Sequence, residues 1–109
     1  MSFVHLHNHS YYSLLDGLGP LEQIVECAKK QGSPAVAITD HGVLYGAIDF
    51  FKICRTAGIK PIVGCEIYVA PRSRFDKESG IDTKPYHMIL LAKSYEGYKN
   101  LLQLVTKAH

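Results

Sequence analysis

Residues 34–42 of this 109-residue chain read Pro-Ala-Val-Ala-Ile-Thr-Asp-His-Gly. The run Ala35–Ile38 is apolar without interruption and follows a proline, a pattern typical of a strand buried on both faces of a parallel sheet. Asp40 and His41, two side chains that can bind metal ions, come almost directly after it. Active-site groups in parallel α/β folds gather at the carboxyl ends of strands. This stretch therefore predicts an α/β fold with a site at the end of a strand.

Strand and helix patterns alternate on both sides of this stretch. A period of two predicts a strand over residues 3–9, and apolar residues at helical spacing predict a helix that begins at Pro20 and is closed by Gly32. A second amphipathic stretch, which ends at Gly58, predicts another helix. The later patterns predict a strand over residues 61–63 and 67–69, a strand over residues 88–91, and a helix capped by Ser94.

Composition excludes several classes of protein. The chain is shorter than the ~150 residues of an average domain, so it holds at most one domain. Hydrophobic residues make up 47% and charged residues 20%, close to globular averages, which excludes disorder. Apolar runs are too short to cross a membrane, so no membrane partner is expected. The net charge of +2 is too small to indicate nucleic-acid binding by itself.

The cysteines Cys27, Cys54 and Cys65 are odd in number and form no C-x-x-C pair. They lie within expected helices and strands, which is typical of a reducing compartment where buried thiols act as small hydrophobic groups. The first residues also lack the basic and apolar regions of a secretory signal. We therefore expect a cytoplasmic protein.

Alternating strands and helices indicate either an open parallel sheet or a (βα) barrel. A complete eight-stranded barrel takes about 250 residues, so we expect residues 1–109 to be the N-terminal portion of a larger α/β barrel, with about four βα units. An open four-stranded sheet is the alternative, but it would leave the last strand edge and several apolar helix faces uncovered. Self-association into a homo-oligomer is one way in which such surfaces could be covered.

Candidate metal ligands follow or lie within the expected strands. His7 and His9 are two residues apart, so their imidazoles project to the same side of a strand and can converge on one ion. The other candidates are Asp16, His41, Glu66 and His87. Imidazoles and carboxylates suit zinc, manganese or iron, and divalent ions ~3.5–4 Å apart can polarise a phosphoester and supply a hydroxide. Phosphoester hydrolysis is therefore the predicted reaction class.

Some of these residues have simpler explanations. Asp16 precedes Gly17, so it could be a turn residue. We expect Asp40 to hold an imidazole in the right tautomer rather than to bind metal, with a helix cap as the alternative. We expect His5 to lie in the core or behind the ligands.

Three further positions leave choices open. Cys65 and Glu66 are adjacent on a strand and point to opposite faces, so only one can face the ions, and we choose Glu66. His87 begins its strand, whereas the other ligands lie near strand ends, unless this strand is antiparallel or the barrel is distorted. Tyr11 and Tyr12 could stack on a base, but packing is the expected use.

Residues 71–84 hold seven charged residues in fourteen, which indicates a solvated loop. Three of the seven, Arg72, Arg74 and Lys77, form a basic spot, but acidic residues lie among them. A contact of this loop with DNA is the alternative.

Four segments resemble the PHP (polymerase and histidinol phosphatase) family. They are residues 5–17, which read HLHNHSYYSLLDG, residues 38–42, which read ITDHG, residues 59–70, which read IKPIVGCEIYVA, and residues 86–93, which read YHMILLAK. The third segment and residues 96–101 are similar to the branch of the family found at the N-terminus of bacterial replicative DNA polymerases.

The resemblance implies a distorted seven-stranded (βα) barrel and a metal cluster held by six ligands. These are His7, His9, Asp16, His41, Glu66 and His87. The family pattern continues with a Cys or His and then an Asp-x-His, which would follow residue 109. We expect two or three divalent ions in the complete domain, zinc or manganese before iron, and weaker or partial binding by these residues.

Three functions remain open. The first is the PHP region of a replicative DNA polymerase, with DNA and the other polymerase subunits as partners and a metal-dependent 3′-5′ exonuclease activity that the resemblance implies for some members. The second is a free-standing phosphoesterase that acts on a small phosphate such as histidinol phosphate. The third is a structural or docking module without catalysis. The polymerase-like third segment favours the first.

Overall fold

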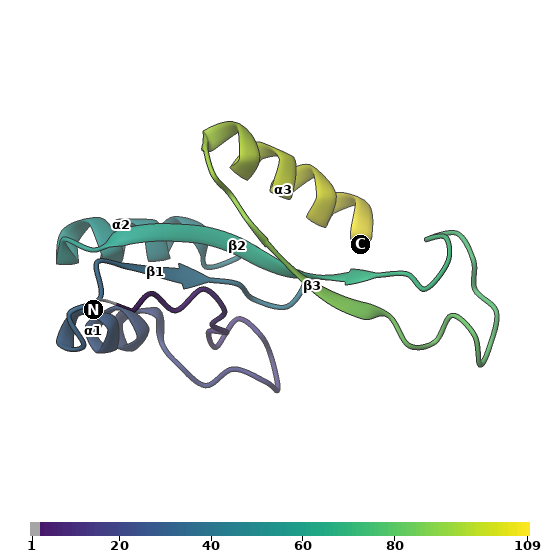
Figure 1. The fold of residues 1–109 in the computed structure, drawn as a ribbon, viewed down its shortest axis with the longest axis horizontal. Coiled ribbons are helices and arrows are strands. Elements are labelled where there is room, and N and C mark those ends of the chain that lie inside the picture. The colour runs from purple at the N-terminus through teal and green to yellow at the C-terminus, as the bar shows by residue number, and fades with distance from the viewer. Residues whose placement is uncertain (1–2) are drawn as a thin grey trace.

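The computed structural model describes residues 3–109. Its elements are α1 (Leu21–Lys30), β1 (Ala35–Ile38), α2 (Ala47–Ala57), β2 (Lys60–Val69), β3 (Tyr86–Leu91) and α3 (Tyr95–Ala108) (Figure 1). The strands form one sheet in the order β1-β2-β3, in which β1 and β2 are parallel and β3 is antiparallel to β2. The predicted α/β class is confirmed.

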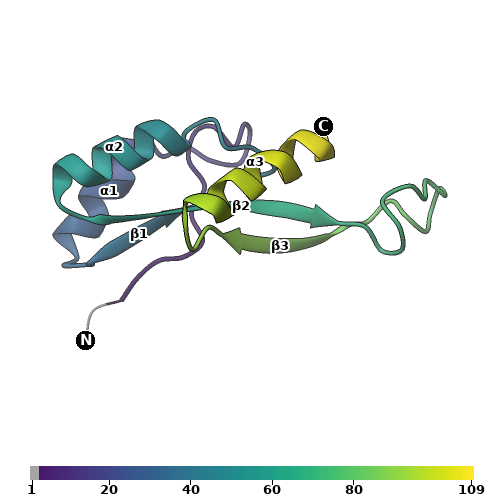
Figure 2. The same ribbon diagram turned by 90° about the horizontal axis from the view of Figure 1, so that it is seen from above.

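Apolar burial is concentrated where α1 and α2 pack on β1 and β2. Figure 2 shows both helices on the same side of the sheet. Their shared core consists of Leu21, Val25, Ala28, Val36, Ile38, Phe50, Cys54 and Ile59. All four residues of β1 are buried, as the uninterrupted apolar run predicted. Removing this apolar surface from water, at roughly 25 cal/mol per Å², is the main force that holds this half together.

The ends of the helices follow the local signals in the sequence. Pro20 is the N-cap of α1, and Gly58 ends α2 in the left-handed conformation, with φ of 75°. The hydroxyl of Ser94 caps α3 by accepting a hydrogen bond from the backbone N–H of Gly97 at 3.2 Å. The predicted helix boundaries are therefore confirmed.

Strand β2 changes partner near its middle. Lys60–Val63 pairs with β1, whereas Gly64–Val69 pairs with β3. A Cβ atom on Gly64 would lie 2.5 Å from the carbonyl oxygen of Leu90 and 3.1 Å from Cγ2 of Thr39, so a side chain would force β3 away. The outer half of β2, β3 and the loop that joins them extend away from the packed half (Figure 1).

The prediction of a regular strand over residues 3–9 is wrong. This segment does run beside β1, because Ala37 N–H donates to the carbonyl of His5 at 3.0 Å and Thr39 N–H donates to that of Asn8 at 2.8 Å. However, Asn8 N–H donates to the Thr39 hydroxyl, and the Asn8 amide donates to the Ala37 carbonyl. In a regular strand the backbone would make these hydrogen bonds, whereas here the side chains of Asn8 and Thr39 take part in them.

The count of about four βα units also needs correction. Within residues 3–109 the chain forms three strands, and β3 follows β2 through a loop without an intervening helix. An antiparallel pair needs no crossover helix, so this connection can be direct. The antiparallel direction also explains how His87 reaches the site from the start of its strand.

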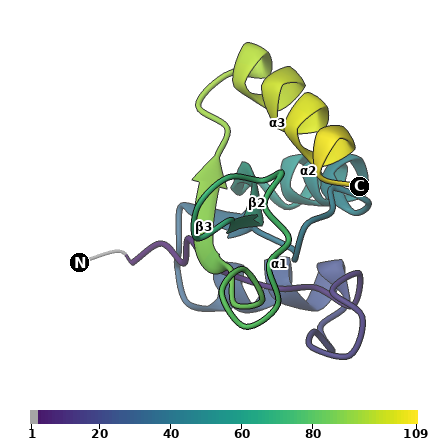
Figure 3. The ribbon, with the colours of Figure 1, turned by 90° about the vertical axis from the view of Figure 1, so that its right-hand side faces the viewer.

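Helix α3 packs mainly against β2, and Leu101 is its buried residue. Seen end-on in Figure 3, the three helices lie around one side of the strands, and the N-terminal segment starts on the other. Nε2 of His109 donates a hydrogen bond to the carbonyl of Gly42 at 3.0 Å, which ties the end of α3 to the turn after β1. None of the helices in residues 3–109 is long and apolar enough to cross a membrane.

The cysteines partly follow the prediction. Cys54 and Cys65 are buried and unpaired, and burial raises the pKa of the Cys54 thiol to about 11. Cys27 is exposed on α1, so the expectation of burial is wrong for that residue. It occupies a position on the helix face that turns away from the core.

Candidate metal centre

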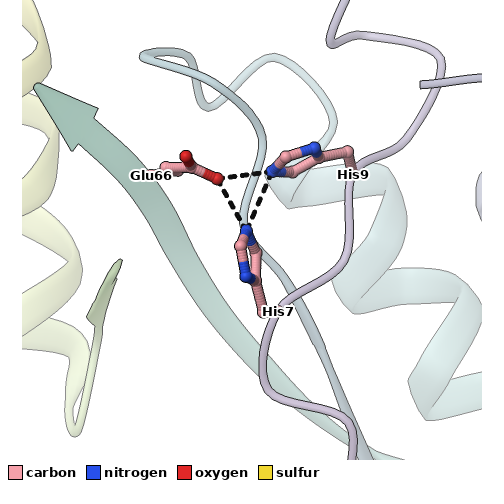
Figure 4. Close-up of side chains that lie close together, drawn as sticks. All are labelled: His7, His9 and Glu66. Carbon is pink, nitrogen blue, oxygen red and sulfur yellow. Dashed lines mark hydrogen bonds and ion pairs between the residues drawn. The ribbon is translucent and has the colours of Figure 1, made fainter. Parts of the chain in front are cut away.

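Two imidazoles converge on one carboxylate oxygen at the centre of the site. Nε2 of His7 and Nε2 of His9 each donate to Oε2 of Glu66 at 2.6 Å, and the two nitrogens are 3.1 Å apart (Figure 4). Glu66 is only 3% exposed. Figure 4 shows that the histidines come from the N-terminal segment and the glutamate from β2.

The other three predicted ligands extend this cluster. Nδ1 of His87 donates to the second oxygen of Glu66, Oε1, at 2.5 Å, and Nδ1 of His41 lies 3.6 Å from the same oxygen. Nε2 of His41 also donates to Oδ2 of Asp16, and that oxygen lies 3.2 Å from Nδ1 of His9. The structure thus brings together all six predicted ligands, with Glu66 in the middle.

Backbone pairing beyond β1 places His41 beside Glu66. Glu66 N–H donates to the carbonyl of Asp40 at 3.0 Å, and Gly42 N–H donates to the carbonyl of Glu66 at 2.8 Å. On the other edge of β2, His87 is paired with Tyr68, so its side chain lies diagonally from Glu66 on the same face. The ligands from three distant segments therefore meet because β2 pairs on both sides.

Asp40 organises the loop that carries the remaining ligands. Its carboxylate accepts hydrogen bonds from the backbone N–H of Ser10 at 2.6 Å, from the Ser10 hydroxyl at 2.8 Å and from the Ser13 hydroxyl at 2.7 Å. The Ser13 oxygen in turn accepts from His41 N–H at 3.1 Å. Among the described residues Asp40 contacts no imidazole, so its predicted role in holding a tautomer is wrong. Asp40 instead serves as the buried acceptor for the Ser10 N–H and the two serine hydroxyls, which would otherwise be buried without a hydrogen-bond partner.

The remaining sequence candidates lie outside the cluster. His5 is exposed and packs edge-on against Phe3, with ring centroids 4.8 Å apart, so it lies neither in the core nor behind the ligands. Sγ of Cys65 points at the carbonyl of Asp40, at 3.4 Å, which leaves Glu66 as the residue that faces the histidines. Tyr12 packs against the core, and the ring of Tyr11 stacks on it at 4.5 Å.

Glu66 is charged in this environment. Burial raises the pKa of its carboxyl, but hydrogen bonds from His7, His9 and His87 outweigh burial and lower the pKa to about 2. The site therefore presents a buried carboxylate at neutral pH, surrounded by imidazoles.

These donors fit a divalent cation. Three groups of ligand atoms lie within 4.8 Å of one another: His7, His9 and Glu66; His9, Asp16 and His41; and His41, Glu66 and His87. Ligands about 2.1 Å from a tetrahedral ion are separated by roughly 3.4 Å. The atoms of the first group are 2.6 to 3.1 Å apart, so they would have to move apart by less than about 1 Å to surround an ion. Both histidines in that group donate to one oxygen, so their adjacent nitrogens cannot bond each other, whereas a cation could accept a lone pair from all three atoms.

Two features of the site escaped the sequence analysis. The ring of Tyr68 lies 4.8 Å from that of His87, edge to face, and its hydroxyl is 3.5 Å from Nδ1 of His41. The available signal was its position two residues after Glu66, which places both side chains on one face of the strand. Ser10 and Ser13 were also missed, because nothing in a local pattern shows that they share a buried acceptor.

The PHP domain family matches residues 5–109, and the chain belongs to this family. It is 56% identical over 110 residues to DNA polymerase III subunit alpha of Treponema pallidum and 44% identical over 113 residues to that of Thermus aquaticus. In each comparison the match takes in 100% of this chain but 9% of the relative, and it falls in the relative's N-terminal part.

Solved structures with the same fold are more distant in sequence. A protein from Bifidobacterium adolescentis assigned to the metal-dependent phosphoesterases superposes with a TM-score of 0.65 at 21% identity. An amidohydrolase from Chromobacterium violaceum superposes with a TM-score of 0.65 at 20% identity. Each alignment covers 92% of this chain and 32% of the other. The predicted partial PHP barrel is thereby confirmed as the fold.

Proposed function

We propose that residues 1–109 are the N-terminal portion of the PHP domain of a replicative DNA polymerase, and that this domain binds divalent metal ions and hydrolyses phosphoesters as a 3′-5′ exonuclease. The observation that carries the proposal is the convergence of four imidazoles around the buried carboxylate of Glu66, with Asp16 beside two of them. The identity of 41–56% with DNA polymerase III alpha subunits supports the polymerase branch over a free-standing phosphoesterase.

The cluster offers donors for two or three ions, in groups that share His9, His41 and Glu66. His7 and His9 share Oε2 of Glu66, and His87 contacts Oε1, so the two oxygens of this carboxylate would be available to help hold different ions. Asp16 and His41 form a further pair. Each imidazole would then give one nitrogen to one ion. Imidazole and carboxylate donors suit zinc or manganese, and also iron.

The residues of this chain would hold and orient the ions. When bound, clustered divalent ions polarise a phosphoester and make a nearby water more acidic. Glu66 keeps its negative charge in the buried centre, and Asp40 fixes the loop from His9 to Asp16 through the two serines. Further ligands from the rest of the barrel would complete the site, so we expect little hydrolysis by residues 1–109 alone.

The activity of the whole protein extends beyond these residues. Nucleotidyl transfer by the DNA-directed DNA polymerase would take place in another domain, since the chain spans 9% of its polymerase relatives. DNA and the other polymerase III subunits are the partners we propose for the whole protein, and the cytoplasm is its proposed location.

The test is elemental analysis of the purified chain after mild dialysis. We expect zinc, manganese or iron to remain bound, at a substantial fraction of one equivalent, and to be lost from the His7→Ala/His9→Ala double variant. The matched control is His5→Ala, which removes an imidazole from the same segment but outside the cluster and should keep the metal. Equal metal in the wild type and the double variant would refute the site.

The reaction is tested on the whole protein that carries this sequence. We expect metal-dependent removal of 3′-terminal nucleotides from a labelled oligonucleotide, and its loss in Glu66→Gln. Metal binding without any such hydrolysis would instead favour a structural or docking module.

A further inference from the structure

His41 can join either of two groups of ligands in the cluster. Its ring nitrogens lie within 4.8 Å of ligand atoms of His9 and Asp16 on one side, and of Glu66 and His87 on the other. Nε2 faces Asp16, and Nδ1 lies 3.6 Å from Oε1 of Glu66. A neutral imidazole carries one N–H and one lone pair, so only one of the two nitrogens can bind an ion. The position of the proton on His41 therefore decides which group it joins.

A neighbouring hydroxyl can fix that proton. The hydroxyl oxygen of Tyr68 lies 3.5 Å from Nδ1 of His41, slightly nearer than Oε1 of Glu66. Oε1 already accepts a hydrogen bond from Nδ1 of His87 at 2.5 Å, and in the occupied site it would help to hold an ion. The phenol oxygen is therefore the acceptor that stays available to His41 when the cluster is filled.

The pairing of β2 with β3 holds the Tyr68 ring in place. Tyr68 is paired with His87 in the register of the two strands, and their rings meet edge to face with centroids 4.8 Å apart. The Tyr68 ring also lies parallel to that of His41, within 8°, with centroids 6.2 Å apart. Since Tyr68 is 53% exposed, burial in a core does not account for its place. Its hydroxyl is positioned by contacts with two of the candidate ligands.

We infer that Tyr68 is a positioning residue that holds His41 in the tautomer with the proton on Nδ1. The Nδ1–H donates to the Tyr68 hydroxyl, and the lone pair of Nε2 is free for the ion beside Asp16. Histidines that bind metal commonly donate their second N–H to an oxygen, which fixes both the tautomer and the ring orientation. The sequence predicted this role for Asp40, whose carboxylate instead accepts from Ser10 and Ser13.

The inference deepens the proposed function and rests on it, because the tautomer matters only where His41 binds an ion. It assigns the effect to the hydroxyl of Tyr68 rather than to its ring. The ring contacts with His41 and His87 would persist in a phenylalanine, whereas the acceptor for Nδ1–H would be lost. Removal of the single oxygen atom therefore separates positioning from packing.

The test combines zinc binding with NMR of the histidines in the isotope-labelled chain. Long-range proton–nitrogen correlation spectra distinguish the two tautomers, and the signals of His41 are assigned by their loss in His41→Gln. In the zinc-loaded wild type we expect Nδ1 of His41 to carry the proton and Nε2 to bind zinc. Tyr68→Phe should lower zinc affinity about tenfold in a competition with a chelator. The Nδ1–H signal of His41 should also broaden, because this proton would exchange with water.

Tyr86→Phe is the matched control, because it removes the hydroxyl of an exposed tyrosine from β3. Tyr86 precedes His87 on the strand, so its side chain points to the opposite face. Its zinc affinity and the spectrum of His41 should match those of the wild type. An equal loss of affinity in both variants would overturn the inference, as would wild-type affinity in Tyr68→Phe.

Failure of the proposed function gives a different result. A wild-type chain that binds no zinc would refute the metal site and this role together. Zinc bound through Nδ1 of His41, or without His41, would overturn only the role assigned to Tyr68 and leave the metal site intact.

Discussion

The two halves of this sheet are stabilised differently although they build one site. In the β1–β2 half, two helices cover the strands and all eight core residues are buried. In the β2–β3 arm, β3 is exposed or only partly buried along its length, and the strands are joined mainly by backbone hydrogen bonds. The packed half and the segments attached to it carry His7, His9, Asp16 and His41, and the arm contributes Glu66 and His87.

This contrast indicates how the site is assembled. Glu66 belongs to β2 beyond the point where β3 replaces β1 as the paired strand, so its carboxylate faces ligands from both halves. Loss of the core should remove the whole site. Loosening of the arm should weaken mainly the contribution of His87, because Glu66 is also held by backbone hydrogen bonds to Asp40 and Gly42. Substitutions in each half can separate these effects.

The largest expected effect comes from the core of the packed half. Phe50 is fully buried between α2 and the sheet, so Phe50→Ala should lower the free energy of unfolding by about 4 kcal/mol, through lost burial and an unfilled cavity. Urea denaturation measures the change. Ile48→Ala on the same helix, where the side chain is 54% exposed, should cost less than about 1 kcal/mol. Equal losses would show that the packed half does not depend on its buried core.

The next effect comes from Asp40. Asp40→Ala leaves the Ser10 N–H and the two serine hydroxyls without their buried acceptor, which should cost about 3 kcal/mol. Metal affinity should also fall, by roughly 10–100-fold, because the loop from His9 to Asp16 loses its anchor. Denaturation and metal titration measure the two effects.

Asp49→Ala is the control for Asp40→Ala, since Asp49 is exposed in the first turn of α2. It should change neither property appreciably. If Asp40→Ala lowered stability but left metal affinity intact, the loop would be held by other contacts and the role assigned to Asp40 would be wrong.

A smaller and more local effect is expected at Gly64. In Gly64→Ala the new methyl group would meet the Leu90 carbonyl, so the arm should loosen at a cost of about 2 kcal/mol. Hydrogen exchange should increase in β3 more than in β1. Gly97 lies within α3, and its added Cβ would be 3.5 Å from Cα of Ala92, an ordinary contact, so Gly97→Ala should instead stabilise the chain slightly. Uniformly faster exchange in β1 and β3 would mean that the halves unfold as one unit.

Local signals were sufficient for much of the packed half. The apolar run of β1 and the caps Pro20, Gly58 and Ser94 depend on nearby residues, and the structure confirms them. The period of two in residues 3–9 did not establish a regular strand, because it is also compatible with an irregular segment whose hydrogen bonds to β1 are completed by the side chains of Asn8 and Thr39. Hydrophobic periodicity also says nothing of strand direction, so the antiparallel β3 could not be derived.

The site was predictable to the extent that it depends on residue type. The structure places the six predicted ligands in one cluster, and their role in binding metal stays a prediction. The supporting residues were less visible. The sequence predicted that Asp40 holds an imidazole, whereas in the structure its carboxylate accepts hydrogen bonds from the hydroxyls of Ser10 and Ser13. Such contacts join segments about thirty residues apart, which a local pattern does not encode.

The smallest effect is expected at the far end of the arm. Arg72 joins Asp82 and Glu78 across the loop; its own side chain and that of Glu78 are exposed, whereas that of Asp82 is 5% exposed. Because these pairs lie in the loop, away from the packed core, and have an exposed partner, they should contribute little to global stability. Arg72→Ala should therefore leave the urea midpoint unchanged but speed proteolytic cleavage between residues 71 and 85 about threefold, because the loop opens more often. High salt should reduce the difference from the wild type, since it screens exposed pairs.

Arg72→Lys should behave like Arg72→Ala, because an ammonium group cannot bridge two carboxylates as a guanidinium does. A shift of the urea midpoint as large as that of Gly64→Ala would instead mean that the arm depends on its tip as much as on the pairing of β2 with β3.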